Sequence, residues 1–190
     1  TQPVRRVWIP KLGGCEKRPL GIPTVRDRIV QAAVAMTLGP ISEIGFEEQS
    51  YGFRPKRGAK DALRRVARLL KDGYEWVVDV DIRKYFDTID HGILMKRVRE
   101  KIGDGKMLSL IESFLKQGVM ESHKGWKPTP SGTPQGAIIS PLLSNIYLDD
   151  LDKEMRMEGL EMIRYADDFV VMCKTEEEAN EVLGMIRDWT

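Results

Sequence analysis

Apolar and polar residues alternate in some stretches of the chain and follow a helical period in others. Residues 5–23 alternate around a Gly-Gly pair, which predicts a β-hairpin. Residues 24–41 have helical spacing and begin with a Thr-x-x-Asp capping box, and Gly39 followed by Pro40 predicts the end of this helix. Its apolar positions are Ile29, Val30, Ala33, Val34 and Met36.

A strongly amphipathic helix is expected next, over residues 59–72. Its apolar face is predicted to consist of Leu63, Val66, Ala67 and Leu70. Basic residues fall on one side at spacings of four, four and three, namely Lys60, Arg64, Arg68 and Lys71. Such a side is either an ordinary solvated face or a row of charges that follows phosphate groups, and the pattern alone leaves both open.

The rest of the chain predicts a buried, β-branched strand over 75–82, followed by helices and hairpins. Helices are expected over 90–102, 105–117, 138–157 and from 176 onward, and hairpins over 118–130 and 160–174. This order predicts an α+β fold with an antiparallel sheet packed on helices. We place the boundary near residue 75, with a smaller helix and hairpin region over 1–75 and the main sheet within 76–190.

Composition is that of a globular protein, with 42% hydrophobic and 31% charged residues. The net charge of +1 hides an asymmetry: residues 1–75 carry 15 Lys and Arg against 8 Asp and Glu, and residues 76–190 carry 15 against 21. A basic half beside an acidic half suits a protein that binds a polyanion with one part and cations with the other. Chance is the simpler explanation until motifs are considered.

The acidic half contains carboxylates in unusual places. Asp167 and Asp168 adjoin each other between two runs of strand-forming residues. Asp81 lies near the end of the strand expected over 75–82, and it would meet Asp167 if that strand neighbours the last hairpin. Converging carboxylates repel unless cations neutralise them, and Mg²⁺ prefers such oxygen ligands. A solvated polar turn remains the alternative, because an Asp-Asp pair alone is a weak signal.

Five motifs in order resolve this choice, because together they resemble the reverse transcriptases, most closely the group II intron-encoded type, also called intron maturases. The motifs are RPLGIPTVRDRIVQ (18–31), SYGFRPKRGAKDAL (50–63), VDIRKYFDTIDH (80–91), SGTPQGAIISPLLSNIYLDDLDKEM (131–155) and YADD (165–168). The resemblance covers nearly the whole chain. It implies a right-hand polymerase with fingers over 1–75 and a palm over 76–190, and an RNA-directed DNA polymerase activity.

The resemblance also implies roles for individual residues. It implies a catalytic, metal-binding set of Asp81, Asp167 and Asp168, with the backbone oxygen of Ile82 as a further ligand. Two Mg²⁺ ions are expected there, and Mn²⁺ can substitute. It implies a nucleotide-binding set of Lys11, Arg18, Phe86, Gln135, Gly136, Tyr165 and Ala166, in which Phe86 excludes the ribose 2′-hydroxyl. The basic row formed by Lys60, Arg64, Arg68 and Lys71 is expected to bind RNA.

The implied partners are an RNA template (the group II intron RNA), a DNA primer and deoxynucleoside triphosphates. One alternative is an RNA-binding splicing cofactor without polymerase activity, which would need the basic half but not the aspartates. Another is a retron, diversity-generating or CRISPR-associated reverse transcriptase. The sequence also leaves open whether two copies form a homodimer.

The two ends of the sequence, its hydropathy and its cysteines indicate in what form and in which compartment the protein occurs. The chain starts at Thr1 and ends within a helical pattern, so we expect a piece of a longer protein, without the thumb and the C-terminal maturase domains. No apolar run has membrane-spanning length. Cys15 and Cys173 lie in unrelated contexts and are expected to be reduced, as in a bacterial cytoplasm.

Overall fold

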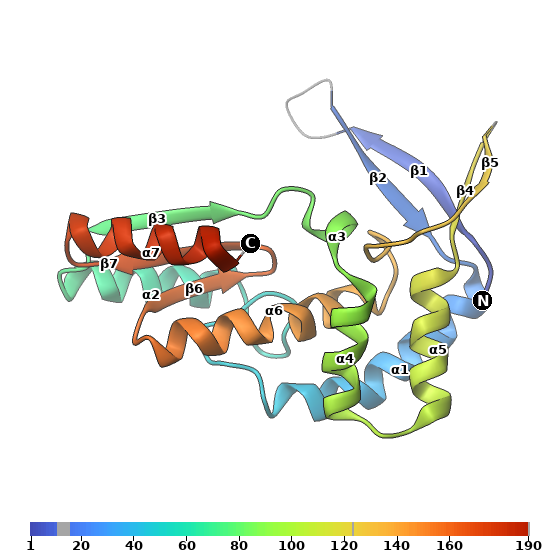
Figure 1. The fold of residues 1–190 in the computed structure, drawn as a ribbon, viewed down its shortest axis with the longest axis horizontal. Coiled ribbons are helices and arrows are strands. Elements are labelled where there is room, and N and C mark those ends of the chain that lie inside the picture. The colour runs from blue at the N-terminus through green and yellow to red at the C-terminus, as the bar shows by residue number, and fades with distance from the viewer. Residues whose placement is uncertain (11–15, 123, 190) are drawn as a thin grey trace. The chain divides into compact units, whose positions relative to one another are not determined.

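The protein is described by a computed structural model that covers residues 1–10, 16–122 and 124–189 (Figure 1). The chain forms two compact units, each made of two separate stretches. Unit 1 comprises Thr1–Ile44 and Lys84–Tyr147, and unit 2 comprises Gly45–Arg83 and Leu148–Thr190. The fingers–palm boundary near residue 75 is a functional division, and it stays a prediction.

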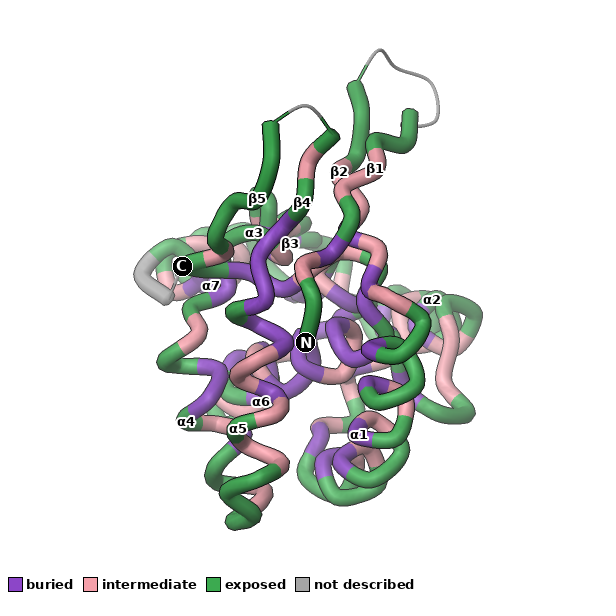
Figure 2. Tube along the Cα trace, turned by 90° about the vertical axis from the view of Figure 1, so that its right-hand side faces the viewer, coloured by how far each residue is buried: buried purple, intermediate pink, exposed green. Residues whose placement is uncertain are grey.

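Unit 1 contains a four-stranded sheet in the order β2-β1-β4-β5. Its strands are β1 (Val4–Pro10), β2 (Lys17–Ile22), β4 (Val119–Glu121) and β5 (Gly125–Lys127). Both hairpins are antiparallel, as predicted, and a short parallel pairing of β1 with β4 joins them. Val4 and Val119 face each other in that pairing and are buried, whereas the far ends of both hairpins are exposed (Figure 2).

The helices of unit 1 supply most of its core. They are α1 (Val25–Glu43), α3 (Tyr85–Thr88), α4 (His91–Lys101), α5 (Gly105–Lys116) and the first part of α6 (Ser140–Met157). All of these helices contribute buried apolar side chains, including the short α3 through Tyr85; the others include Leu38, Leu94, Val98, Ile111, Phe114, Leu143 and Ile146. Asp90 caps α4 by accepting from the Ile93 N–H, so the helix begins where its sequence predicted.

The helix α1 differs from its prediction in two respects. It continues through Pro40 to Glu43, because a proline so near the end of a helix removes only one hydrogen bond, on a turn that water reaches. Its buried face carries Gln31, Val34 and Leu38, whereas Met36 and most of the other expected apolar positions are not buried. Thr24 caps the helix as predicted by accepting from the Asp27 N–H at 3.2 Å, and its hydroxyl donates to the Asp27 carboxylate at 2.8 Å, so half of the predicted capping box is confirmed.

Unit 2 is built on a three-stranded antiparallel sheet in the order β3-β7-β6. Its strands are β3 (Trp76–Asp81), β7 (Asp168–Cys173) and β6 (Glu161–Tyr165), and α7 (Glu176–Trp189) lies along β3 and β7 (Figure 1). The strand predicted over 75–82 is present, but the prediction that it is buried was wrong. β3 is an edge strand in which only Val78 is buried, because its second edge has no strand partner among the described residues.

The helix α2 (Ala59–Lys71) packs against β6 through a face that was predicted correctly only at Val66. Ala62 and Leu69 are buried against Ile163 and Met172, whereas Leu63 and Leu70 are 66% and 49% exposed. The helix is thus rotated by about one residue from the expected orientation, because Ala62 and Leu69 fit the cluster on the sheet. Within the part of the chain that the structure describes, no helix combines the length and hydropathy needed to cross a membrane.

Candidate active site

Two of the predicted carboxylates face each other across the sheet of unit 2. Asp81 ends β3 and lies directly opposite Asp168, which begins β7. Tyr165, the last residue of β6, lies opposite Asp168 on its other side. The three residues therefore form a row across one face of the sheet, and all three are exposed. Like charges directly opposite each other destabilise a sheet, so this pair favours a bound cation.

Ala166 and Asp167 form the two-residue turn between β6 and β7. Ala166 has a positive φ of 63°, and Asp167 does not, which is the pattern of a type II′ turn. The first central position of such a turn usually holds glycine, because a side chain is strained there. Since Ala166 is also buried, the surrounding structure must hold this conformation in place.

Part of that support comes from a backbone segment lying against β6. The Tyr51 N–H donates to the Arg164 carbonyl at 2.8 Å, and the Arg164 N–H donates to the Gln49 carbonyl at 2.9 Å. Ser50 and Arg164 thereby form a parallel bridge. Gly52 follows and comes so close that an added Cβ would lie 2.2 Å from the Ala166 nitrogen. Only glycine leaves room for the turn at this position.

A buried ion pair supplies the rest of the support. Arg164 on β6 and Asp152 on α6 are both completely buried, and the guanidinium binds both carboxylate oxygens, at 2.7 and 2.5 Å. Burial raises the pKa of Asp152, and the hydrogen bonds from Arg164 act in the opposite direction by favouring its charged form. The sequence analysis missed this pair, although a charge inside a strand of otherwise buried residues signals a partner.

The three predicted metal ligands supply carboxylate oxygens, which suit a hard divalent cation. The structure brings Asp81 and Asp168 together as cross-strand partners and places Asp167 in the adjoining turn. However, no group of three or more His, Cys, Asp or Glu side chains among the described residues is arranged to hold a metal ion. The chemistry of these oxygen donors and the facing of Asp81 and Asp168 suit such an ion, and the complete ligand set of Asp81, Ile82, Asp167 and Asp168 remains a prediction.

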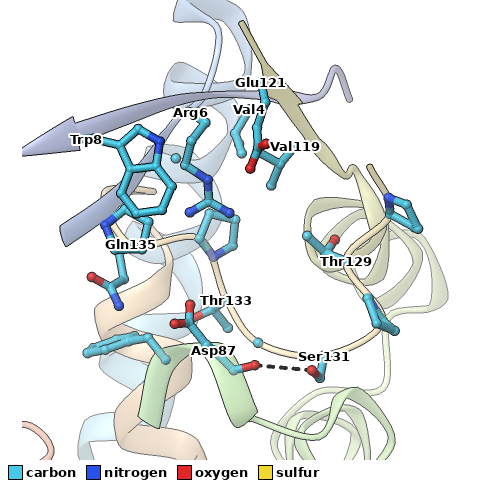
Figure 3. A pocket seen from close by; sticks show the side chains of 17 residues that line it. Val4, Arg6, Trp8, Asp87, Val119, Glu121, Thr129, Ser131, Thr133 and Gln135 are labelled. Carbon is cyan, nitrogen blue, oxygen red and sulfur yellow. Dashed lines mark hydrogen bonds between the residues drawn. The ribbon is translucent and has the colours of Figure 1, made fainter. Parts of the chain in front are cut away.

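The predicted nucleotide-binding residues Phe86 and Gln135 line a pocket of about 330 Å³ within unit 1 (Figure 3). The loop before α6 forms one side of the pocket, and β1, β2 and β4 contribute others. Two hydrogen bonds fix the backbone of the residues that line the pocket. The Gly21 N–H donates to the Gln135 carbonyl and the Thr133 N–H donates to the Phe86 carbonyl, both at 2.7 Å. Gly132, at a φ of 82°, leaves no room for a Cβ beside the Phe86 carbonyl.

The pocket holds charged groups of both signs. Arg6 and Trp8 of β1 point into it in Figure 3, together with Asp87 and Glu121. The Arg6 guanidinium lies 6.0 Å from the Trp8 ring, and a hydrogen bond from Lys127 lowers the pKa of Glu121. No local pattern linked Arg6 with Glu121, because the pairing of β1 with β4 brings these two residues together.

Other predicted residues are placed as follows. Arg18 is exposed on β2 opposite Ile9 and does not line this pocket. Gly136 has a φ of 104° and follows Gln135 in the loop. Lys11 lies outside the described residues. The nucleotide-binding roles of this set, and those of Tyr165 and Ala166, remain predictions.

The basic row on α2 is exposed along its whole length, as expected for either of its two interpretations. Arg64 pairs with Asp61 at 2.7 Å, and Arg68 also lines a hollow of about 500 Å³ in unit 2. Three further arginines line that hollow, Arg57, Arg65 and Arg156, which sequence reasoning did not connect. Arg65 and Arg156 are paired with Glu161 and Glu47, so part of the positive charge is neutralised.

Two curated proteins from bacteria are similar to most of this chain. The group II intron-encoded protein LtrA of Lactococcus lactis subsp. cremoris is 49% identical over 152 residues, which cover 80% of this chain and 25% of the relative. The protein YkfC of Escherichia coli is 46% identical over 155 residues, covering 80% and 40%. This chain therefore spans a quarter to two fifths of the length of these relatives.

Solved structures show the same fold. A chain of a partial Cas6-RT-Cas1–Cas2 complex is 28% identical, with a TM-score of 0.53 over 99% of this chain and 32% of that one. Telomerase from Candida albicans, solved with a fragment of telomeric RNA, reaches a TM-score of 0.73 at 12% identity, covering 98% and 40%. The family model of reverse transcriptase (RNA-dependent DNA polymerase) matches residues 9–190. This chain belongs to the reverse transcriptase family and has its fingers–palm fold.

Proposed function

We propose that the protein carrying this chain is an RNA-directed DNA polymerase of a group II intron. The reaction is template-directed transfer of a deoxynucleotide to a primer 3′-hydroxyl, with pyrophosphate as the leaving group. One observation carries the proposal: Asp81 lies directly opposite Asp168, beside a strained turn that contains Asp167. Two exposed carboxylates in this unfavourable pairing are not expected in a sheet that has only a structural role.

Reverse transcriptases as a family use divalent metal ions, and we propose two Mg²⁺ ions for this protein, replaceable by Mn²⁺. Asp81, Asp167, Asp168 and the Ile82 carbonyl would hold them. When bound, such ions lower the pKa of the attacking hydroxyl and neutralise charge on the leaving phosphates. The chain itself fixes where the carboxylates lie, through the β3–β7 register and the turn.

The pocket in unit 1 supports a role in nucleotide selection. We propose that Phe86 blocks the ribose 2′-hydroxyl and that Gln135 and Gly136 border the incoming nucleotide and the template. Arg18 and Lys11 would hold the triphosphate, and Tyr165 with Ala166 would lie beside the primer end. The support is that Phe86 and Gln135 line one pocket and that backbone hydrogen bonds fix both positions.

RNA binding that assists intron splicing is a second function, favoured by the exposed basic row on α2. Its four cations are exposed to solvent, where they can contact the phosphates of a folded intron RNA, and Arg64 would do so in exchange for its pairing with Asp61. The bacterial group II intron-encoded relative at 49% identity favours this intron type over the CRISPR-associated alternative, whose solved chain is 28% identical. This relative also supports a bacterial cytoplasmic setting.

Primer extension on an RNA template with Mg²⁺ and deoxynucleotides tests the polymerase proposal. The full-length protein should be compared with Asp167→Asn and with the control Asp72→Asn, which makes the same change at an exposed residue after α2. We expect extension by the wild type and the control only. A folded, RNA-binding wild type that extends no primer would refute polymerase activity and leave splicing assistance as the function.

A further inference from the structure

We propose that Arg164 is a positioning residue, which holds the turn that carries Asp167 in the conformation needed for catalysis. This inference rests on the proposed polymerase function. It adds to that function a residue that touches neither nucleotide nor metal. The residue acts through the backbone of the turn.

The side chain of Arg164 joins three parts of unit 2. Its Nε and Nη2 donate to the Asp152 carboxylate of α6, at 2.7 and 2.5 Å. Nη2 also donates to the Ser50 hydroxyl at 2.7 Å, and Nη1 donates to the Ala166 carbonyl at 2.8 Å. The planar guanidinium thus links helix α6, the segment around Ser50 and the turn through a single rigid group.

The bond to Ala166 is the one that concerns catalysis. The Ala166 carbonyl belongs to the peptide that leads into Asp167, so its orientation sets the direction in which the Asp167 side chain leaves the backbone. Ala166 adopts a φ of 63°, which a residue with a side chain rarely takes without support. A charged donor at 2.8 Å fixes this peptide more firmly than a neutral donor would.

The other contacts of the network hold the guanidinium itself. Asp152 orients it from α6, and Gln49 Nε2 donates to the Asp152 carbonyl at 2.7 Å. The segment 49–52 is tied to β6 by backbone hydrogen bonds and ends with Gly52 against the turn. The same few residues therefore support the turn from two sides, through the side chain of Arg164 and through the backbone of Gly52.

A stabilising role for the ion pair alone is the competing explanation. Buried pairs can often be replaced by apolar residues of similar volume without loss of stability. Such a replacement keeps the packing but removes the donor to the Ala166 carbonyl. The double substitution Arg164→Met with Asp152→Leu therefore separates the two explanations.

The experiment uses the full-length protein and compares this double variant with the wild type and with Asp167→Asn. Urea unfolding shows whether the variant is folded. Steady-state primer extension gives kcat and the KM for deoxynucleotides, and the Mg²⁺ concentration is varied. Hydrogen exchange of a peptide that contains residues 165–168 reports on the turn independently of activity.

If Arg164 positions the turn, the folded double variant loses about ten- to a hundredfold in kcat, the range typical for residues that orient metal ligands. Its KM stays within about twofold, since ground-state nucleotide binding is left intact. It needs more Mg²⁺ for half-maximal rate, and exchange of the turn becomes faster. A folded variant with wild-type kcat and unchanged exchange would overturn the proposal.

The variant Arg164→Lys provides a second test of the positioning role, and this test remains informative if the double variant does not fold. It keeps the charge but replaces the planar fork with a single ammonium group. We expect a lower kcat with faster exchange of the turn, and unchanged values of both would overturn the proposal. Inactivity of the wild type would instead refute the polymerase function, and the exchange measurement would still test the turn.

Discussion

The two units hold their candidate functional residues in different ways. In unit 1, Phe86 and Gln135 line an open pocket, and backbone hydrogen bonds between loops and strands keep them in place. In unit 2, the carboxylates stand on a regular antiparallel sheet, and a completely buried ion pair supports the turn between its strands. The first arrangement holds its residues through the backbone alone, whereas the second holds the turn through a charged side chain as well.

This difference matches what each part would have to do. A pocket that selects a nucleotide, as proposed for unit 1, acts through the shape of the side chains that line it. Charged groups that stabilise a transition state act best when they are held rigid before the reaction. We therefore expect substitutions in unit 2 to change kcat and substitutions in the pocket of unit 1 to change selectivity or KM.

The largest effect is expected for Asp81→Asn in unit 2. It removes one of the two facing carboxylates, and we expect primer extension to fall by at least about a hundredfold, the scale of losing a preorganised charged group. Because the repulsion with Asp168 is also removed, the free energy of unfolding should rise by about 0.2–1 kcal/mol. Activity loss together with a loss of stability would contradict this account.

A smaller effect is expected for Gly52→Ala. The new methyl group would meet the Ala166 nitrogen, so the turn must shift, and we expect a lower kcat and a loss of about 1–3 kcal/mol of unfolding free energy. The matched control is Gly39→Ala in α1, where nothing lies within 4 Å, which should stabilise the protein by about 0.5–1 kcal/mol. Equal effects at both sites would show that the close approach to the turn is unimportant.

In unit 1, Phe86→Ala should change selectivity more than rate. Removing the ring opens the pocket, and we expect the preference for deoxynucleotides over ribonucleotides to fall by roughly tenfold or more. Competitive primer extension with both nucleotide types measures this ratio. Phe53→Ala, at an exposed phenylalanine, is the control. An unchanged ratio in the Phe86 variant would remove Phe86 from the nucleotide site.

The smallest effect is expected on the surface of α2. The double substitution Arg64→Gln with Arg68→Gln should weaken RNA binding a few-fold and reduce the slope of log affinity against log salt by about 1–2. The exposed pair Lys96→Gln with Arg99→Gln on α4 removes the same charge as a control. If both pairs change the slope equally, the basic row on α2 has no special role in RNA binding.

The sequence predicted the elements of this fold well because periodicity and capping act locally. The hairpins, the starts of α4 and α7 and the position of the carboxylate turn all follow from such local patterns. The burial of β3 and the face of α2 could not be predicted in the same way. Both depend on which elements lie next to them, and that is decided by contacts between distant parts of the chain.

The same distinction applies to the candidate sites. Asp81, Asp167 and Asp168 were found through motifs, and the strand register then placed Asp81 opposite Asp168. The partners of Arg164 come from two distant segments, around Ser50 and Asp152, and no local pattern links them. A buried strand that contains an arginine shows that a partner exists, but only the fold identifies it.

Because each unit is made of two separate stretches, the order of synthesis matters for activity. Unit 1 is incomplete until Tyr147 has been made, and β3 has no neighbouring strand until β7 follows. Contacts so far apart in the chain form slowly and late. Asp81 therefore leaves the ribosome long before its cross-strand partner Asp168. A nascent chain that stops before β7 lacks the facing carboxylates on which the proposed polymerase function rests.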